Sequence, residues 1–167
     1  MSYKNKTYVI FDGDKDIWAY GRMKGWNALP NIDFNFFDAH DINELRDGTL
    51  EPTVKRKLKE RLANTKQAVV LIGDSTKNLY RYVRWEIDCC IDLGIPIVAV
   101  NLNGLRKMDD KLCPPILKGK PVVHVPFKMK IIKHALDDFC GNYSSVLFRG
   151  ITDCYYPDEV YSQLGIE

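Results

Sequence analysis

The chain has 167 residues, of which 46% are hydrophobic and 28% charged, and its formal net charge at pH 7 is +2. These values are those of an ordinary globular protein of one domain, and they lack the basic excess that nucleic-acid binding requires. No apolar run approaches the roughly 20 residues that span a bilayer, and the first residues contain no secretion signal. We therefore expect a cytoplasmic protein whose partners include neither nucleic acid nor a membrane.

Cysteine and histidine residues are too scattered to predict a metal or redox centre. The five cysteines are odd in number and form no CxxC pair, and the three histidines are widely separated. We predict no metal site and no disulfide framework, with the thiols kept reduced.

The amino-terminal part predicts strands and helices in alternation. Residues 7–11 are β-branched and aromatic and end at an acidic turn, which is typical of a strand. Asp16 is placed to cap a helix over residues 17–27, and residues 33–37 predict a second strand. Residues 38–50 have no periodicity, as in many lids and binding loops. A second helix begins at residue 51, with Pro52 in its first turn.

The stretch over residues 67–103 predicts a strand, a polar turn, a helix and another strand. Residues 68–72 are continuously apolar, which indicates a strand covered on both faces and hence a parallel sheet. The turn is Gly73-Asp74-Ser75-Thr76, and the helix covers residues 78–93. Residues 95–100 predict the fourth strand. Glu86 lies on the flank of the apolar stripe of that helix, about two turns from its start.

The remainder predicts a short strand over residues 121–125, a helix over residues 128–139 and an aromatic-rich segment over residues 143–167. We expect that last segment to pack on the same domain. Alternating strands and helices predict an α/β fold: a doubly wound, mainly parallel sheet of about five strands, with helices on both faces.

Ligands of doubly wound folds bind beyond the carboxyl ends of the strands, and acidic turns collect at that edge here. They contain Asp12 and Asp14, Asp38, and Asp74. Acids that lie close together can hold Mg²⁺, but the same residues are common turn formers and helix caps. Glu86 has two interpretations as well: an active-site carboxylate, or a surface glutamate paired with Arg81 or Lys77. Neither GxGxxG nor GxxxxGK[ST] occurs in the chain.

Four segments in the same order resemble bacterial TIR-like domains of the Thoeris type. They are YVIFDGDKD at residues 8–16, FFDAHD at residues 36–41, LIGDST at residues 71–76, and VRWEI at residues 83–87 followed by PIVAVN at residues 96–101. The resemblance covers roughly residues 6–103. It implies a flavodoxin-like sheet, with a TIR-like domain over residues 1–126 and an extension over residues 127–167 that packs on it.

The resemblance also implies an enzyme that cleaves NAD⁺ at the nicotinamide–ribose bond, with NAD⁺ as substrate and no separate cofactor. The product would be ADP-ribose or a cyclic isomer, sensed by a separate effector protein in antiphage defence. Self-assembly of the enzyme is expected, and the aromatic residues Tyr80, Tyr82 and Trp85, which we expect to be exposed, would permit it. Glu86 matches the catalytic glutamate. The implied substrate contacts are Phe11, Asp12, Asp14, Asp38, Gly73, Asp74, Ser75, Thr76 and Trp85.

Two alternatives stay open. A non-catalytic TIR module would act through homotypic contacts and release no nicotinamide. A receiver-like phosphoacceptor would need an aspartate at the end of the third strand and a lysine at the end of the fifth. Asp74 and Lys128 are both poorly placed for those roles.

Overall fold

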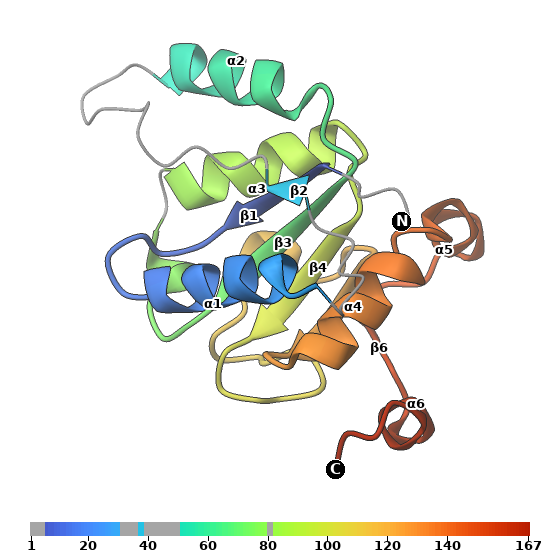
Figure 1. Ribbon diagram of the computed structural model, residues 1–167. Coiled ribbons are helices and arrows are strands. Elements are labelled where there is room, and N and C mark those ends of the chain that lie inside the picture. The colour runs from blue at the N-terminus through green and yellow to red at the C-terminus, as the bar shows by residue number, and fades with distance from the viewer. Residues whose placement is uncertain (1–5, 31–36, 39–50, 80–81) are drawn as a thin grey trace.

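The computed structural model describes residues 6–30, 37–38, 51–79 and 82–167 (Figure 1). Within these ranges one sheet contains six parallel strands in the order β2-β1-β3-β4-β5-β6. The strands are β1 (Lys6–Ile10), β2 (Phe37–Asp38), β3 (Gln67–Ile72), β4 (Ile97–Asn101), β5 (Val122–Pro126) and β6 (Cys154–Tyr155). The predicted flavodoxin-like α/β fold is confirmed. The sixth strand lies in the segment for which the sequence predicted no strand.

The chain starts in the middle of the sheet and winds in both directions. β1 pairs with β2 on one side and with β3 on the other, after which β4, β5 and β6 follow in order. The point between β1 and β3 is where the winding direction changes, and ligands of this fold class bind at the carboxyl ends of strands near such a point.

Helices cover both faces of the sheet (Figure 1). The helices are α1 (Ile17–Ala28), α2 (Glu51–Leu62), α3 (Tyr82–Asp92), α4 (Met129–Asp137), α5 (Tyr143–Arg149) and α6 (Asp158–Gln163), with short 3₁₀ turns η1 (Thr76–Asn78) and η2 (Pro115–Leu117). Helices α1, α4 and α6 contribute to one buried cluster, and α2, α3 and η2 to the other. No helix in the described ranges has the length and apolar character to span a bilayer.

The strands divide their side chains between the two clusters because successive residues point to opposite faces. Val9 of β1 belongs to the α1 and α4 side, whereas Tyr8 and Ile10 belong to the α2 and α3 side. All six residues of β3 are buried. This burial is the reason that residues 68–72 are uninterrupted by polar residues, as expected for a strand with both faces covered.

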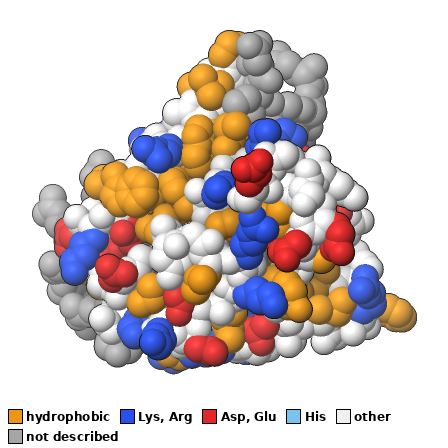
Figure 2. Space-filling model, turned by 90° about the horizontal axis from the view of Figure 1, so that it is seen from below, with side chains coloured by type: hydrophobic (Ala, Val, Ile, Leu, Met, Phe, Trp, Pro, Cys, Tyr) orange, Lys and Arg blue, Asp and Glu red, His pale blue; other side chains and the backbone are white. Residues whose placement is uncertain are grey.

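The aromatic carboxyl-terminal segment packs on the α1 and α4 side of the sheet. Tyr161 of α6 is fully buried and Ile166 is 9% exposed, and both belong to that cluster. The outer surface of the domain carries charges of both signs. On the face shown in Figure 2, lysine and arginine side chains lie among aspartate and glutamate side chains, in keeping with the small net charge.

The helix predicted over residues 78–93 starts later than expected. The chain first forms η1, and Leu79 leaves the helical region with φ −89° and ψ 79°. The Thr76 side chain holds this turn, accepting a hydrogen bond from the Gly73 N–H at 2.9 Å and donating to the Leu71 carbonyl at 3.3 Å. Glu86 therefore lies about one turn inside α3, not two.

Candidate functional site

A cavity of about 490 Å³ lies between the loop after β1 and the start of α3. Its volume is within the range of small-molecule sites, roughly 300–1,000 Å³. The lining residues are Phe11, Asp12, Gly13, Asp14, Asn78, Leu79, Tyr82, Val83 and Glu86. The cavity thus brings together Glu86 and the predicted contacts Phe11, Asp12 and Asp14.

Glu86 is one of two buried carboxyl groups among the described residues that line this cavity, at 9% exposure against 5% for Asp12. It reaches the cavity from α3, whose neighbouring residues Val83 and Ile87 anchor the helix in the core. Oxygen Oε2 has no hydrogen-bond partner among the described residues. Burial raises the pKa of Glu86 to about 8, even though a hydrogen bond from Tyr8 and the charge of Arg61 act in the opposite direction. Before substrate binds, the carboxyl group is therefore mostly protonated at pH 7.

Phe11 forms an aromatic wall of the cavity. It follows β1 directly and stacks on Tyr20 of α1, with ring centroids 4.7 Å apart. Tyr82 and Val83 supply further apolar surface from the first turn of α3. Carboxylates therefore lie beside rings and aliphatic groups, an arrangement suited to a ligand with both flat and charged parts.

The oxygens of Asp12 are used by the protein itself. Oδ1 accepts hydrogen bonds from the N–H groups of Asp14 at 3.0 Å and Lys15 at 3.3 Å, and Oδ2 accepts one from the Ser75 hydroxyl at 2.7 Å. Burial alone would raise the pKa of Asp12, but these hydrogen bonds outweigh it and lower the pKa. Ionised Asp12 thus links the loop after β1 to the β3–η1 turn by hydrogen bonds. Asp14 is the exposed acidic residue at the cavity.

Asp16 does not cap α1 as predicted. It occupies the position before the helix, but its side chain makes no capping hydrogen bond. The carboxyl group instead turns toward the β3–η1 turn, where it meets Thr76. A Cβ atom on Gly73 would overlap this carboxyl group, with Oδ1 only 2.7 Å away. Gly73 is required there to let Asp16 approach.

Residues of the β3–η1 turn line two other cavities. Gly73 and Asp74 line one of about 450 Å³ together with Asp16 and Trp18, and Thr76 lines a small one beside η2. Ser75 reaches the Glu86 cavity only indirectly, through its hydrogen bond to Asp12. Of this turn, no residue lines the Glu86 cavity.

The two remaining predicted contacts are Trp85 and Asp38. Trp85 is half-buried and packs at right angles to Tyr82, with centroids 5.6 Å apart, but it does not line the cavity. Trp85 and Tyr82 were expected to be exposed; both pack instead against the α2 and α3 cluster. Asp38 ends β2, and its side chain, Tyr80 and the loop over residues 39–50 lie outside the described residues.

Tyr8 and Arg61 are the partners of Glu86 that sequence reasoning missed. Tyr8 is 1% exposed on β1, and Arg61 is in the last turn of α2. The alternation along residues 7–11 places Tyr8 and Ile10 on one face of β1, but nothing local shows which helix covers that face.

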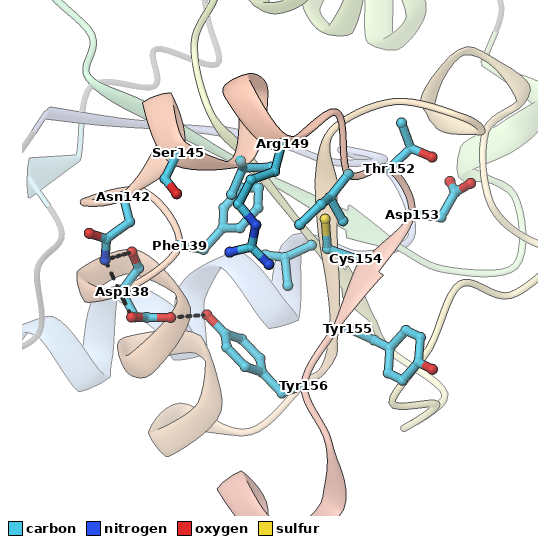
Figure 3. A pocket seen from close by; sticks show the side chains of 13 residues that line it. Asp138, Phe139, Asn142, Ser145, Arg149, Thr152, Asp153, Cys154, Tyr155 and Tyr156 are labelled. Carbon is cyan, nitrogen blue, oxygen red and sulfur yellow. Dashed lines mark hydrogen bonds between the residues drawn. The ribbon is translucent and has the colours of Figure 1, made fainter.

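A second cavity, of about 500 Å³, lies between α4, α5 and β6 (Figure 3). Arg149 extends into its middle, while Asp138 accepts a hydrogen bond from the Tyr156 hydroxyl at 3.2 Å. The Asn142 amide donates to the Asp138 backbone carbonyl at 2.8 Å. Val123, near the amino end of β5, also lines this cavity. It is therefore separate from the edge where Glu86 lies.

The chain matches the model of a known protein family. The model described as the Thoeris protein ThsB, TIR-like domain, matches residues 4–107. The matched segment contains all the described residues that line the Glu86 cavity, and it ends after β4. The second cavity lies wholly beyond it.

Proposed function

The chain belongs to the family of Thoeris ThsB TIR-like domains, and from this membership we propose that it cleaves NAD⁺ at the nicotinamide–ribose bond in antiphage defence. The observation that carries the proposal is a buried carboxyl group, Glu86, at a cavity on the ligand-binding edge of the sheet. The product would be ADP-ribose or a cyclic isomer, which a separate effector protein would sense.

The reaction needs a group that stabilises positive charge. As the glycosidic C–N bond breaks, its electron pair stays with nicotinamide, which leaves as a neutral molecule, and the ribose carbon becomes oxocarbenium-like. Attack by water gives ADP-ribose and a proton, and attack by an atom of the same molecule gives a cyclic isomer and a proton. A carboxylate held in a site with little water lowers this barrier electrostatically.

Glu86 would change its protonation as substrate binds. Burial raises its pKa to about 8, so the group is mostly neutral at pH 7 before substrate binds. A cationic nicotinamide ring nearby favours the ionised form and lowers that pKa. Substrate binding would therefore release the Glu86 proton, and the resulting carboxylate would face the developing charge.

The rest of the cavity is compatible with this substrate. Phe11 and Tyr82 offer ring surfaces for a flat base. The negative charge of Asp12 would repel a pyrophosphate, but its oxygens already accept hydrogen bonds from Ser75, Asp14 and Lys15. The exposed carboxylate of Asp14 would also repel the pyrophosphate. A positively charged side chain from a second copy of the chain, brought close by self-assembly, would offset this repulsion.

The test is NAD⁺ turnover by the purified protein, with and without lysate of phage-infected cells as trigger. We expect Glu86→Gln, which keeps size and removes ionisation, to reduce nicotinamide release by about 100-fold or more. Glu60→Gln is the matched control, because Glu60 is exposed on α2 and paired only with Arg56 at 3.3 Å among the described residues. Chromatography would measure nicotinamide, and mass spectrometry would identify the second product.

Equal turnover by the wild type and Glu86→Gln would remove Glu86 from the mechanism. Failure of the wild type to release nicotinamide under any condition would favour the non-catalytic module that acts through homotypic contacts.

A further inference from the structure

Glu86 is held from two other elements of the fold. The Tyr8 hydroxyl donates a hydrogen bond to the Glu86 carboxylate from β1, which lies beneath α3. The positive charge of Arg61 acts on the same carboxylate from the last turn of α2, and α2 packs along α3. The segments that carry these three residues are far apart in sequence, and only the fold brings them together.

Tyr8 is a hydrogen-bond donor to Glu86. It is 1% exposed, and burial together with the neighbouring Glu86 charge raises its pKa above the usual range, so the hydroxyl keeps its proton. Its ring belongs to the same core cluster as Leu58, Leu62 and Ile87. The position of the hydroxyl is therefore fixed by core packing, as a group that orients a catalytic side chain requires.

The positive charge of Arg61 offsets part of the desolvation free energy of the ionised Glu86 side chain. A buried carboxylate is stabilised by nearby positive charge and by hydrogen bonds to its ionised form. The thiol of Cys90, on α3 itself, also interacts with Glu86, and its pKa is raised by burial and by the Glu86 charge. Among the groups described around Glu86, Arg61 therefore supplies the positive charge and Tyr8 the hydrogen bond.

We propose that Tyr8 and Arg61 are positioning residues for Glu86, which hold its carboxylate in one orientation and support the ionised form as a cationic substrate enters. The proposal rests on the function proposed above for Glu86. Neither residue lines the cavity, so neither is expected to touch the substrate. Their effect should appear in the ionisation of Glu86 and in kcat, with little change in KM.

The direct experiment measures the titration of the Glu86 carboxyl carbon by ¹³C NMR, with the signal identified by its loss in Glu86→Gln. We expect Tyr8→Phe and Arg61→Gln each to move the titration midpoint to higher pH, because each removes a group that favours ionisation. Arg61→Lys keeps the charge and should restore a midpoint near that of the wild type. This pair of Arg61 variants still provides the test if Tyr8→Phe does not fold.

Two variants serve as matched controls. Tyr161→Phe removes a buried hydroxyl that has no hydrogen-bond partner among the described residues, in the other core cluster. Arg56→Gln removes an exposed arginine from the same helix as Arg61. Neither should move the Glu86 midpoint.

Turnover of NAD⁺ gives the second readout. At pH 7 we expect kcat of Tyr8→Phe and Arg61→Gln to fall by about tenfold, with the acidic limb of the pH profile displaced to higher pH. Unchanged midpoints in both variants would overturn the proposal. Shifted midpoints in a protein that releases no nicotinamide would support the positioning of Glu86 and reject NAD⁺ cleavage, so the two failures are distinguishable.

Discussion

Glu86 is a largely buried carboxylic acid, and this environment makes its proton affinity a property of the fold. It is 9% exposed, and burial raises its pKa to about 8 despite the opposing effects of Tyr8 and Arg61. Asp12, which lines the same cavity, shows the opposite case: hydrogen bonds from Ser75 and two backbone N–H groups keep it ionised. Two acids at one cavity are thus given opposite charge states at pH 7, which is typical of functional sites.

The raised pKa of Glu86 predicts how stability depends on pH. The folded chain binds a proton more tightly than the unfolded chain, so between about pH 4.5 and 8 the free energy of unfolding falls as pH rises. The slope reaches about 1.4 kcal/mol per pH unit within this window and disappears above it. Glu86→Gln removes this contribution. We expect its melting temperature to match that of the wild type near pH 4.5 and to exceed it at pH 8.5.

Thermal unfolding followed by circular dichroism at several pH values provides the check. Glu60→Gln, on the exposed face of α2, should retain the pH dependence of the wild type. Parallel curves for the wild type and Glu86→Gln would contradict the buried, protonated state assigned to Glu86.

At the scale of elements, the turn between β3 and α3 determines which side chains surround the cavity. The helix predicted over residues 78–93 includes Leu79, but in the structure Leu79 precedes α3 and lines the cavity. The hydrogen bonds of Thr76 produce this difference. A local competition between side-chain and helical hydrogen bonds is not visible in hydrophobic periodicity.

The short helix α6 is fixed by its single fully buried side chain. Tyr161 is 0% exposed in the α1 and α4 cluster, and the Arg106 guanidinium lies 4.0 Å from its ring centroid. We expect Tyr161→Ala to reduce the free energy of unfolding by about 3–5 kcal/mol, as for other large aromatic truncations in a core. Phe148 of α5 is 92% exposed, so Phe148→Ala should change it by less than about 0.5 kcal/mol. Urea titration measures both variants, and similar values would contradict the packing of α6.

At the scale of the whole molecule, the sheet needs more of the chain than the family match covers. The match ends at residue 107, after β4. Helix α4 then places Ile131, Ile132, Ala135 and Leu136 in the cluster that also contains Val98, Val100, Val123 and Val125 of the strands. Without α4, one face of β4 and β5 would be open to water.

A truncated chain of residues 1–126 should therefore lose its fixed structure. Removing α4, α5, β6 and α6 exposes the apolar side chains that α4 covers, at roughly 25 cal/mol for each Å² of apolar surface. We expect a chain without cooperative thermal unfolding that binds the dye ANS, whereas the full chain unfolds in one transition. A cooperative transition in the truncated chain would show that residues 1–126 fold alone.

The cavity was predictable in part. Glu86, Phe11, Asp12 and Asp14 come together because the carboxyl ends of neighbouring parallel strands share one edge, a rule that periodicity alone can apply. Gly73, Asp74 and Thr76 follow a strand at that same edge, but they line other cavities. The sequence rule places residues at an edge and does not resolve the separate cavities along it.

The sequence by itself determined the fold class, the order of its main elements and the residues near the ligand-binding edge, because alternation, apolar runs and turn residues are local signals. Only the tertiary structure decided the state of Glu86. Its burial, the hydrogen bond from Tyr8 and the charge of Arg61 depend on β1, α2 and α3 meeting in space. Solvent exclusion and electrostatic interaction act through space, so the proton affinity of a carboxyl group follows from its neighbours in the fold.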